Sequence, residues 1–283
     1  MRYSISYNDY YACVDSLGGE LVTLSKNNKN ILWNRDKQYW ADSALILFPF
    51  IGRNYNDKYI YKNIEYSMPI HGFANKSEFT FIKQSINSLT FSLKDNERTF
   101  INYPFHFELT IKYELYEDGL HIEFKVINNS DEVMPYALGY HPGFILNKAL
   151  DNYFIKFNNS NDPKEIGVVT KCMLNGNNTK LNLVNYKLQL NKNLFNCSAK
   201  VYTGVGNDIS LLDNESQIIN IKYDGFKNIV LWQTLNSDAN FICIEGWDGL
   251  PGRYEHIDDI SLDQKKNLLK PKDCDIRNVQ ISF

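Results

Sequence analysis

Short runs of alternating apolar and polar residues cover most of this 283-residue chain. Such period-two runs, bounded by Asn, Asp, Gly and Ser, predict half-buried β-strands. The segment 107–127 is the clearest example, because two alternating runs meet at Glu117-Asp118-Gly119, an acidic-Gly turn that suits a hairpin. No stretch of the sequence has the apolar spacing of a four-turn amphipathic helix. The pattern therefore predicts an all-β protein.

The strand-like runs recur along the whole sequence, and no Pro/Gly/Ser-rich linker interrupts them. We therefore expect one domain over residues 1–283, folded as a large antiparallel β-sandwich of many strands. The segment 158–196 is richer in Asn and Lys and alternates less. It is predicted to form loops and short strands at one edge.

The charge balance argues against two classes of partner. With 30 basic and 33 acidic residues, the chain has no positive excess to attract nucleic acid or an anionic membrane. The beginning of the sequence, MRYSISYNDYYACV, lacks a basic stretch followed by an apolar run, and no apolar segment approaches eighteen residues. We therefore expect a cytoplasmic protein that contacts neither membrane nor nucleic acid.

The five cysteines, whose count is odd, include no pair at C-x-x-C spacing. Neither a disulfide framework nor a zinc site is indicated, and reduced thiols are expected. The cysteines are Cys13, Cys172, Cys197, Cys243 and Cys274.

Two of the five histidines lie beside Gly or Pro. His71 in MPIHGFANKSEF and His141 in ALGYHPGFIL are each expected where a strand ends and a loop begins, which is where sites form. A single histidine at a turn is more commonly structural, so neither carries the argument alone. His106, His121 and His256 are expected at edges or on the surface.

Glu245 follows the apolar run FICI and precedes Gly246-Trp247. A carboxylate on an otherwise buried strand beside an aromatic ring would have a raised pKa, which suits a base acting near neutral pH. An edge-strand or turn carboxylate is the alternative. Trp247 could offer a stacking surface to a sugar.

Arg53 ends the largely apolar run LFPFIGR. Its guanidinium could donate forked hydrogen bonds to hydroxyl groups or hold a carboxylate. A salt bridge that caps the sheet is an equally open interpretation.

No metal or cofactor is expected. His71, His141 and Glu245 have the ligand types of a two-histidine, one-carboxylate centre, but their spacing gives no compact motif. Phosphate-binding glycine loops, a nucleophile elbow and a dinucleotide fingerprint are absent from the sequence.

Three segments together resemble the aldose 1-epimerase family of galactose-mutarotase-like proteins, in particular its LacX-like bacterial branch. They stand in family order as LFPFIGRNYNDKYIYKNIEYSMPIHGFANKSEF, MPYALGYHPGF and FICIEGWDGLPG. The resemblance extends over nearly the whole chain. It implies the family's large antiparallel β-sandwich, with a sugar held in an open cleft on one sheet.

The resemblance also implies roles for individual residues. Glu245 matches the family's catalytic base, His141 its general acid, His71 a second histidine at the sugar, and Arg53 the arginine that binds hydroxyls. Asp208 is a candidate for the family's sugar-binding aspartate. One departure is Gly246, where many members have proline, and this exchange is expected to loosen the turn that aims Glu245.

The implied reaction interconverts the α and β anomers of a free hexose such as galactose or glucose. Glu245 would take the proton of the C1 hydroxyl while protonated His141 donates to the ring oxygen, which opens the ring. Rotation and closure then give the other anomer, without a cofactor or metal. The expected partner is a small aldose, and the protein is expected to be a monomer or a homodimer.

Three alternatives remain open. A hexose 6-phosphate would need a basic cluster, for which only Arg53, Lys76 and Arg253 are obvious near the matched segments. A sugar-binding or sensing protein without catalysis is compatible with the altered residue after Glu245. Glycoside hydrolysis needs two carboxylates around the bond, whereas the matched segments supply one carboxylate and a histidine.

Overall fold

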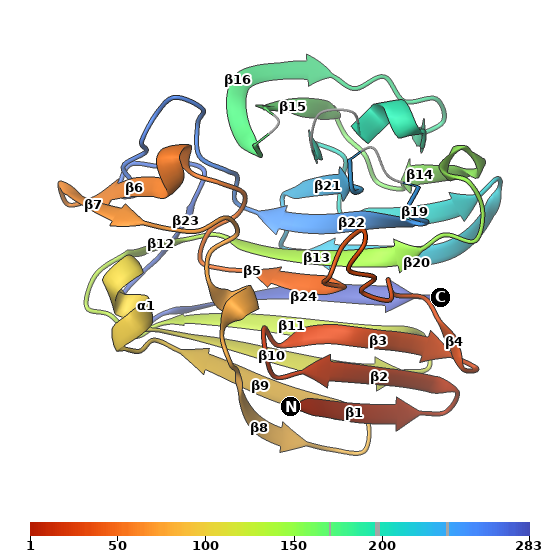
Figure 1. Ribbon diagram of the computed structural model, residues 1–283, viewed down its shortest axis with the longest axis horizontal. Coiled ribbons are helices and arrows are strands. Elements are labelled where there is room, and N and C mark those ends of the chain that lie inside the picture. The colour runs from red at the N-terminus through yellow and green to blue at the C-terminus, as the bar shows by residue number, and fades with distance from the viewer. Residues whose placement is uncertain (170, 196–198, 236–237) are drawn as a thin grey trace.

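The computed structural model describes residues 1–169, 171–195, 199–235 and 238–283. Two large antiparallel sheets dominate the fold (Figure 1), which confirms the predicted β-sandwich. Among these residues the single α-helix is the six-residue α1 (Glu97–Asn102), whose first turn is capped by the Asn96 side chain. Short 3-10 turns are η1 (Tyr55–Asp57), η2 (Ala74–Lys76), η3 (Leu150–Asn152) and η4 (Lys192–Phe195).

The larger sheet has nine strands in the part of the chain that the structure describes. Strands β10 (Phe107–Tyr116) and β11 (Gly119–Asn128) form the predicted hairpin, in which Tyr116 pairs with Gly119 around the turn Glu117-Asp118. The strand order is β17 (Lys187–Gln189), β14 (Tyr153–Phe157), β19 (Asp208–Asp213), β20 (Ser216–Asp224), β24 (Cys274–Ser282), β11 (Gly119–Asn128), β10 (Phe107–Tyr116), β9 (Ser88–Lys94) and β8 (Thr80–Gln84).

The second sheet has seven strands among the described residues. Their order is β16 (Met173–Lys180), β15 (Lys164–Val169), β18 (Lys200–Thr203), β21 (Asn228–Trp232), β22 (Phe241–Asp248), β13 (Leu138–Ile145) and β5 (Ala44–Leu47). Because β16 and β17 are edge strands of the two sheets, the Asn- and Lys-rich segment lies at the edge, as predicted.

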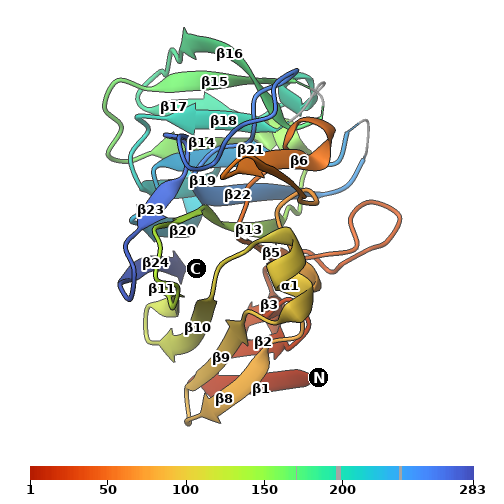
Figure 2. The same cartoon turned by 90° about the vertical axis from the view of Figure 1, so that its left-hand side faces the viewer.

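Three smaller sheets complete the described structure. The first contains β1 (Arg2–Tyr7), β2 (Tyr10–Asp15), β3 (Glu20–Lys26) and β4 (Lys29–Asn30), and the others pair β6 (Lys58–Tyr61) with β7 (Ile64–Ser67) and β12 (Met134–Tyr136) with β23 (Asn267–Leu269). Figure 2 shows β1–β3 beside β8–β10, at the end of the molecule opposite β16.

The main core lies between the two large sheets. Alternate residues of β22, such as Ile242 and Ile244, pack there with residues of the larger sheet such as Phe124 and Ile221. The other residues of β22 point to the outer face of the seven-stranded sheet, yet they are also buried, because loops cover that face. Because β22 is buried on both faces, its sequence before Glu245 is a continuous apolar run and not an alternating one.

Gly246 lies inside β22 and not in a turn, so the expected loosening of a turn was wrong. It pairs with Tyr140 on one side and Ile229 on the other. A Cβ on Gly246 would lie 2.2 Å from the ring of Tyr223, which rises from the larger sheet into this space. The Tyr223 hydroxyl donates a hydrogen bond to the carbonyl of Ile244. Glycine therefore allows the two sheets to approach directly beneath Glu245.

The cysteines that the structure describes, Cys13, Cys172, Cys243 and Cys274, are unbonded, and Cys197 lies outside the described residues. Within the described residues, no helix has the length and apolar character needed to cross a membrane.

Candidate active site

A cavity of about 1020 Å³ opens on the outer face of the seven-stranded sheet. It contains five of the six residues predicted for the site: Arg53, His71, His141, Glu245 and Trp247. Strands β5, β13, β21 and β22 form its floor, and loops provide its walls. The other lining residues are Trp40, Asp42, Leu45, Tyr55, Asn56, Asp57, Ile70, Asn75, Lys76, Lys171, Cys172, Met173, Ala199, Trp232, Leu235 and Tyr254.

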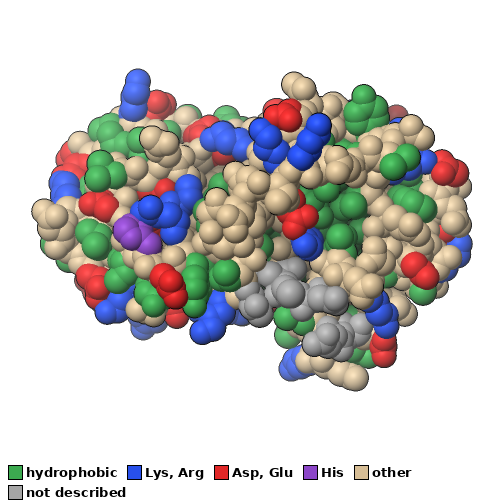
Figure 3. Space-filling model, turned by 90° about the horizontal axis from the view of Figure 1, so that it is seen from above, with side chains coloured by type: hydrophobic (Ala, Val, Ile, Leu, Met, Phe, Trp, Pro, Cys, Tyr) green, Lys and Arg blue, Asp and Glu red, His purple; other side chains and the backbone are tan. Residues whose placement is uncertain are grey.

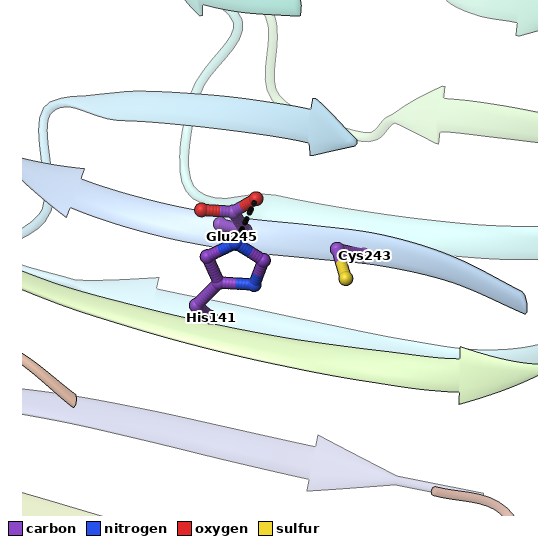
Figure 4. Close-up of side chains that lie close together, drawn as sticks. All are labelled: His141, Cys243 and Glu245. Carbon is purple, nitrogen blue, oxygen red and sulfur yellow. Dashed lines mark ion pairs between the residues drawn. The ribbon is translucent and has the colours of Figure 1, made fainter. Parts of the chain in front are cut away.

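The register of two neighbouring strands brings His141 and Glu245 together. Tyr140 pairs with Gly246 and Gly143 pairs with Cys243, so the register between them places His141 opposite Glu245. His141 Nε2 lies 3.2 Å from Glu245 Oε1, and Figure 4 shows the two side chains pointing toward each other. His141 therefore lies in the middle of β13, and the expectation that it ends a strand was wrong.

Burial favours the uncharged form of both groups. It raises the pKa of Glu245 well above the usual range, and the hydrogen bond from Trp247 only partly opposes this effect. Burial, followed by the nearby His71, lowers the pKa of His141 to about 3. Both shifts favour a neutral pair, in which the shared proton sits on the carboxyl group. Moving it to His141 gives a carboxylate and an imidazolium without exchanging a proton with solvent.

Two polar atoms of this pair are buried without a hydrogen-bond partner among the described residues. They are His141 Nδ1 and Glu245 Oε1, whose contact with His141 lacks the geometry of a hydrogen bond. Buried polar atoms are normally satisfied by protein, water or ligand. The pair is therefore suited to form hydrogen bonds with a ligand that enters the cavity.

Trp247 positions Glu245. Its indole Nε1–H donates a hydrogen bond of 2.7 Å to Glu245 Oε2, and its side chain is almost completely buried. Trp247 is therefore poorly exposed for stacking, in contrast to the sequence-based expectation. Trp40 and Trp232 are half-buried instead and line the cavity, with ring centroids 5.1 and 5.5 Å from that of His141.

His71 is anchored to the loop that carries Arg53. Its backbone N–H donates to the Gly52 carbonyl at 2.8 Å, and the Gly52 N–H donates back to His71 Nδ1 at 3.1 Å. Burial, assisted by Arg53, lowers the pKa of His71 to about 4. With Nδ1 acting as acceptor, the neutral ring carries its proton on Nε2. His71 is thus a neutral hydrogen-bond donor in the cavity wall.

Arg53 is half-buried at the cavity wall and forms an ion pair with Asp57, with Nη1 2.7 Å from Oδ1. Both interpretations of the sequence are therefore compatible with its position: it holds a carboxylate, and other donors of its planar guanidinium are available to a ligand.

Asp208 does not join this site. It begins β19 in the nine-stranded sheet, and its Oδ1 accepts hydrogen bonds from the side chains of Asn158 and Asn220. The sequence could not reveal this separation, because sheet assignment depends on pairing between distant segments. His106, His121 and His256 also lie outside the cavity lining, near Asp95, Asp118 and Asp258 respectively.

The cations that line the cavity are Arg53, Lys76 and Lys171. Lys76 and Lys171 are exposed, and neither has an ion pair with a described residue. Arg253 instead holds the buried Asp258, with Nε 2.7 Å from Oδ1. On the face around β15 and β16, basic and acidic side chains are interspersed, and hydrophobic side chains are visible where the surface is hollowed (Figure 3).

Three possible metal ligands lie together at the bottom of the site. One ligand atom each from His141, Cys243 and Glu245 falls within 4.8 Å of the others, and Figure 4 shows Cys243 farther along the same strand as Glu245. Cys243 does not line the cavity, and burial raises the pKa of its thiol well above the usual range. Because a thiol binds metal as thiolate, this set fits a metal poorly.

Sequence reasoning missed the contribution of the segment 40–42 to the cavity. Trp40 and Asp42 both line it, as does Trp232 from β21. Trp40 can fold over the sheet because Gly143 has no side chain: a Cβ there would lie 2.7 Å from the Trp40 ring. The only local signal was a tryptophan two residues before an acidic residue, shortly before a buried strand.

Comparison with known proteins gives one consistent family. Residues 1–262 match the model of the family described as aldose 1-epimerase. The plasmid-encoded protein LacX of Lactococcus lactis subsp. lactis is 32% identical over 257 residues, which are 85% of this chain and 85% of LacX.

Two solved structures are similar in fold over the full length. A galactose mutarotase-like protein from Lactobacillus casei has a TM-score of 0.93 and 24% identity, and the match covers 100% of this chain and 99% of that protein. A galactose mutarotase related enzyme from Lactobacillus acidophilus has a TM-score of 0.92 and 28% identity, with coverage of 100% and 97%.

Proposed function

This chain belongs to the aldose 1-epimerase family and is an isomerase of sugars, and we propose that it interconverts the α and β anomers of a free hexose such as galactose or glucose. The observation that carries the proposal is the buried His141–Glu245 pair, 3.2 Å apart at the floor of a cavity wide enough for a monosaccharide. Anomerisation needs one acid and one base that exchange roles, and this pair supplies both.

In the proposed mechanism, the hydroxyls of a bound sugar satisfy the unpaired atoms of the pair and favour its charge-separated form. Glu245 accepts the proton of the C1 hydroxyl, and protonated His141 donates to the ring oxygen. The C1–O5 bond breaks and the open-chain aldehyde forms. After rotation about C1–C2, the same groups act in reverse, so no net proton is lost or gained.

Other groups orient the sugar in this proposal. Trp247 holds Glu245 through its indole N–H. His71, neutral with its proton on Nε2, donates to a sugar oxygen, and Arg53 donates to hydroxyl groups while it remains paired with Asp57. The half-buried rings of Trp40 and Trp232 offer the apolar surface against which a sugar face packs.

The test is polarimetry or NMR of freshly dissolved α-D-glucose and α-D-galactose. We expect wild type to accelerate anomerisation, and Glu245→Gln and His141→Asn each to reduce the rate by about 10²- to 10⁴-fold. Matched controls are Glu117→Gln and His256→Asn, which change exposed residues outside the cavity and should keep full activity. Wild type that binds an aldose but adds nothing to the spontaneous rate would support a sugar-binding protein and reject the enzyme proposal.

A further inference from the structure

Asp42 is a half-buried carboxylate in the cavity wall, and the sequence-based reasoning gave it no role. Among the described residues, neither a hydrogen bond nor an ion pair involves its side chain. The other acidic residue of the loop walls, Asp57, is paired with Arg53. Asp42 is thus an acceptor that lines the cavity and has no donor among the described residues.

The backbone on both sides of Asp42 is held in place. On the N-terminal side, Trp33 Nε1 donates to the carbonyl of Trp40 at 2.8 Å, and Arg35 Nε donates to the carbonyl of Ala41 at 3.1 Å. On the C-terminal side, the N–H of Ser43 donates to the buried Glu20 Oε1 at 2.6 Å. These bonds hold the backbone of Asp42 in place at the cavity wall.

A cavity-lining carboxylate without a donor among the described residues is suited to a ligand rich in hydroxyl groups. An ionised carboxylate accepts through two oxygens, and each sugar hydroxyl can donate one hydrogen bond. Hydrogen bonds to charged groups are stronger than neutral ones, so such a contact discriminates well between sugars that place a hydroxyl there and sugars that do not.

From this geometry we propose that Asp42 accepts hydrogen bonds from one or two hydroxyl groups of the bound aldose and thereby determines which aldose is preferred. The proposal rests on the function proposed above, because it requires a sugar in this cavity.

The test compares Asp42→Asn with Asp36→Asn. Both variants remove one negative charge from the same loop, but Asp36 is exposed and does not line the cavity. We expect Asp42→Asn to lower kcat/KM by about 10- to 100-fold, mainly through KM, and Asp36→Asn to behave as wild type. A fall in kcat with unchanged KM, or a KM within about twofold of wild type for every aldose, would overturn the proposal.

Deoxy sugars identify the contacted hydroxyl. For the 2-, 3-, 4- and 6-deoxy forms of the preferred hexose, the penalty of Asp42→Asn should disappear for the sugar that lacks the contacted hydroxyl, or shrink for two of them. An equal penalty for all four deoxy sugars would overturn the assignment.

Calorimetric titration with the parent hexoses separates this proposal from the enzyme proposal. If wild type binds a hexose without accelerating anomerisation, the enzyme proposal fails, while weaker binding by Asp42→Asn still supports the role of Asp42. If wild type binds none of the hexoses, both proposals fail.

Discussion

Two buried carboxylates on strand β22, Glu245 and Asp248, lie three positions apart and have opposite surroundings. Both side chains are almost completely inaccessible to solvent. Asp248 Oδ2 accepts from Arg277 Nη2 at 2.6 Å and from Asn267 Nδ2 at 2.8 Å, and Lys227 Nζ lies 3.0 Å from Oδ1. Glu245 has Trp247 and a histidine whose pKa is lowered. Burial is common to both, so the partners decide their chemistry.

The odd separation of the two residues explains the difference. Alternate residues of a strand point to opposite faces, so Glu245 faces the cavity and Asp248 faces the larger sheet, where Arg277 of β24 meets it. A carboxylate held by fixed cations keeps its charge and holds structure together. A carboxylate without them can gain and lose a proton within a reaction.

The largest effect on stability is expected where the Asp248 pair is broken. Arg277→Met leaves a buried carboxylate without its main partner, which should lower the free energy of unfolding by about 3–5 kcal/mol. Urea unfolding monitored by tryptophan fluorescence measures the change. Arg2→Met, which removes an arginine from an exposed ion pair with Asp15, should cost less than about 1 kcal/mol.

The comparison predicts that the Arg277 variant keeps its activity when it is assayed well below its unfolding midpoint, because Arg277 does not line the cavity. If the Arg277→Met variant remained folded but no longer catalysed anomerisation, the assignment of a purely structural role to Asp248 and a chemical role to Glu245 would be wrong.

Lys266 extends this comparison, because it is a buried lysine outside the cavity lining whose Nζ has no hydrogen-bond partner among the described residues. Its Nζ lies 3.9 Å from the centroid of the Phe50 ring, and burial lowers its pKa to about 8 from a usual 10.5. Between these values the unfolded chain binds more protons than the folded protein. Stability linked to Lys266 therefore rises as the pH increases from 8 to 10.5.

Lys266→Met should raise the free energy of unfolding at pH 7 by up to about 3 kcal/mol, and the gain should shrink by pH 10. Unfolding curves at the two pH values, with Lys222→Met as the exposed-lysine control, measure this difference. An equal gain at both pH values would mean that packing, and not the buried charge, is responsible.

The smallest of the expected effects concerns the partner of Glu245. Trp247→Phe removes the indole N–H that bonds Oε2 and should lower kcat by about 10-fold with little change in KM, because the carboxylate loses a bond that favours its charged form. The split between kcat and KM in progress curves tests this positioning role. A rise in KM alone would assign Trp247 to sugar binding instead.

The local pattern of the sequence was sufficient to predict that the chain forms strands. The hairpin over 107–127 and the edge position of the segment after residue 158 follow from alternation and turn residues, which act between neighbours along the chain. The family-like motifs also identified Arg53, His71, His141 and Glu245 as residues of one site, because residue types and their order can be compared along the sequence.

The all-β class, the family and five of the residues that line the cavity could therefore be derived from the sequence. Four features depended on the three-dimensional arrangement: His141 lies opposite Glu245, Tyr223 occupies the space beside Gly246, Asp208 belongs to the other sheet, and Asp42 lines the cavity. The physical reason is that register and sheet packing join segments far apart in the chain. The relative positions of these segments depend on which faces the assembled sheets bury, and not on residues adjacent in the sequence.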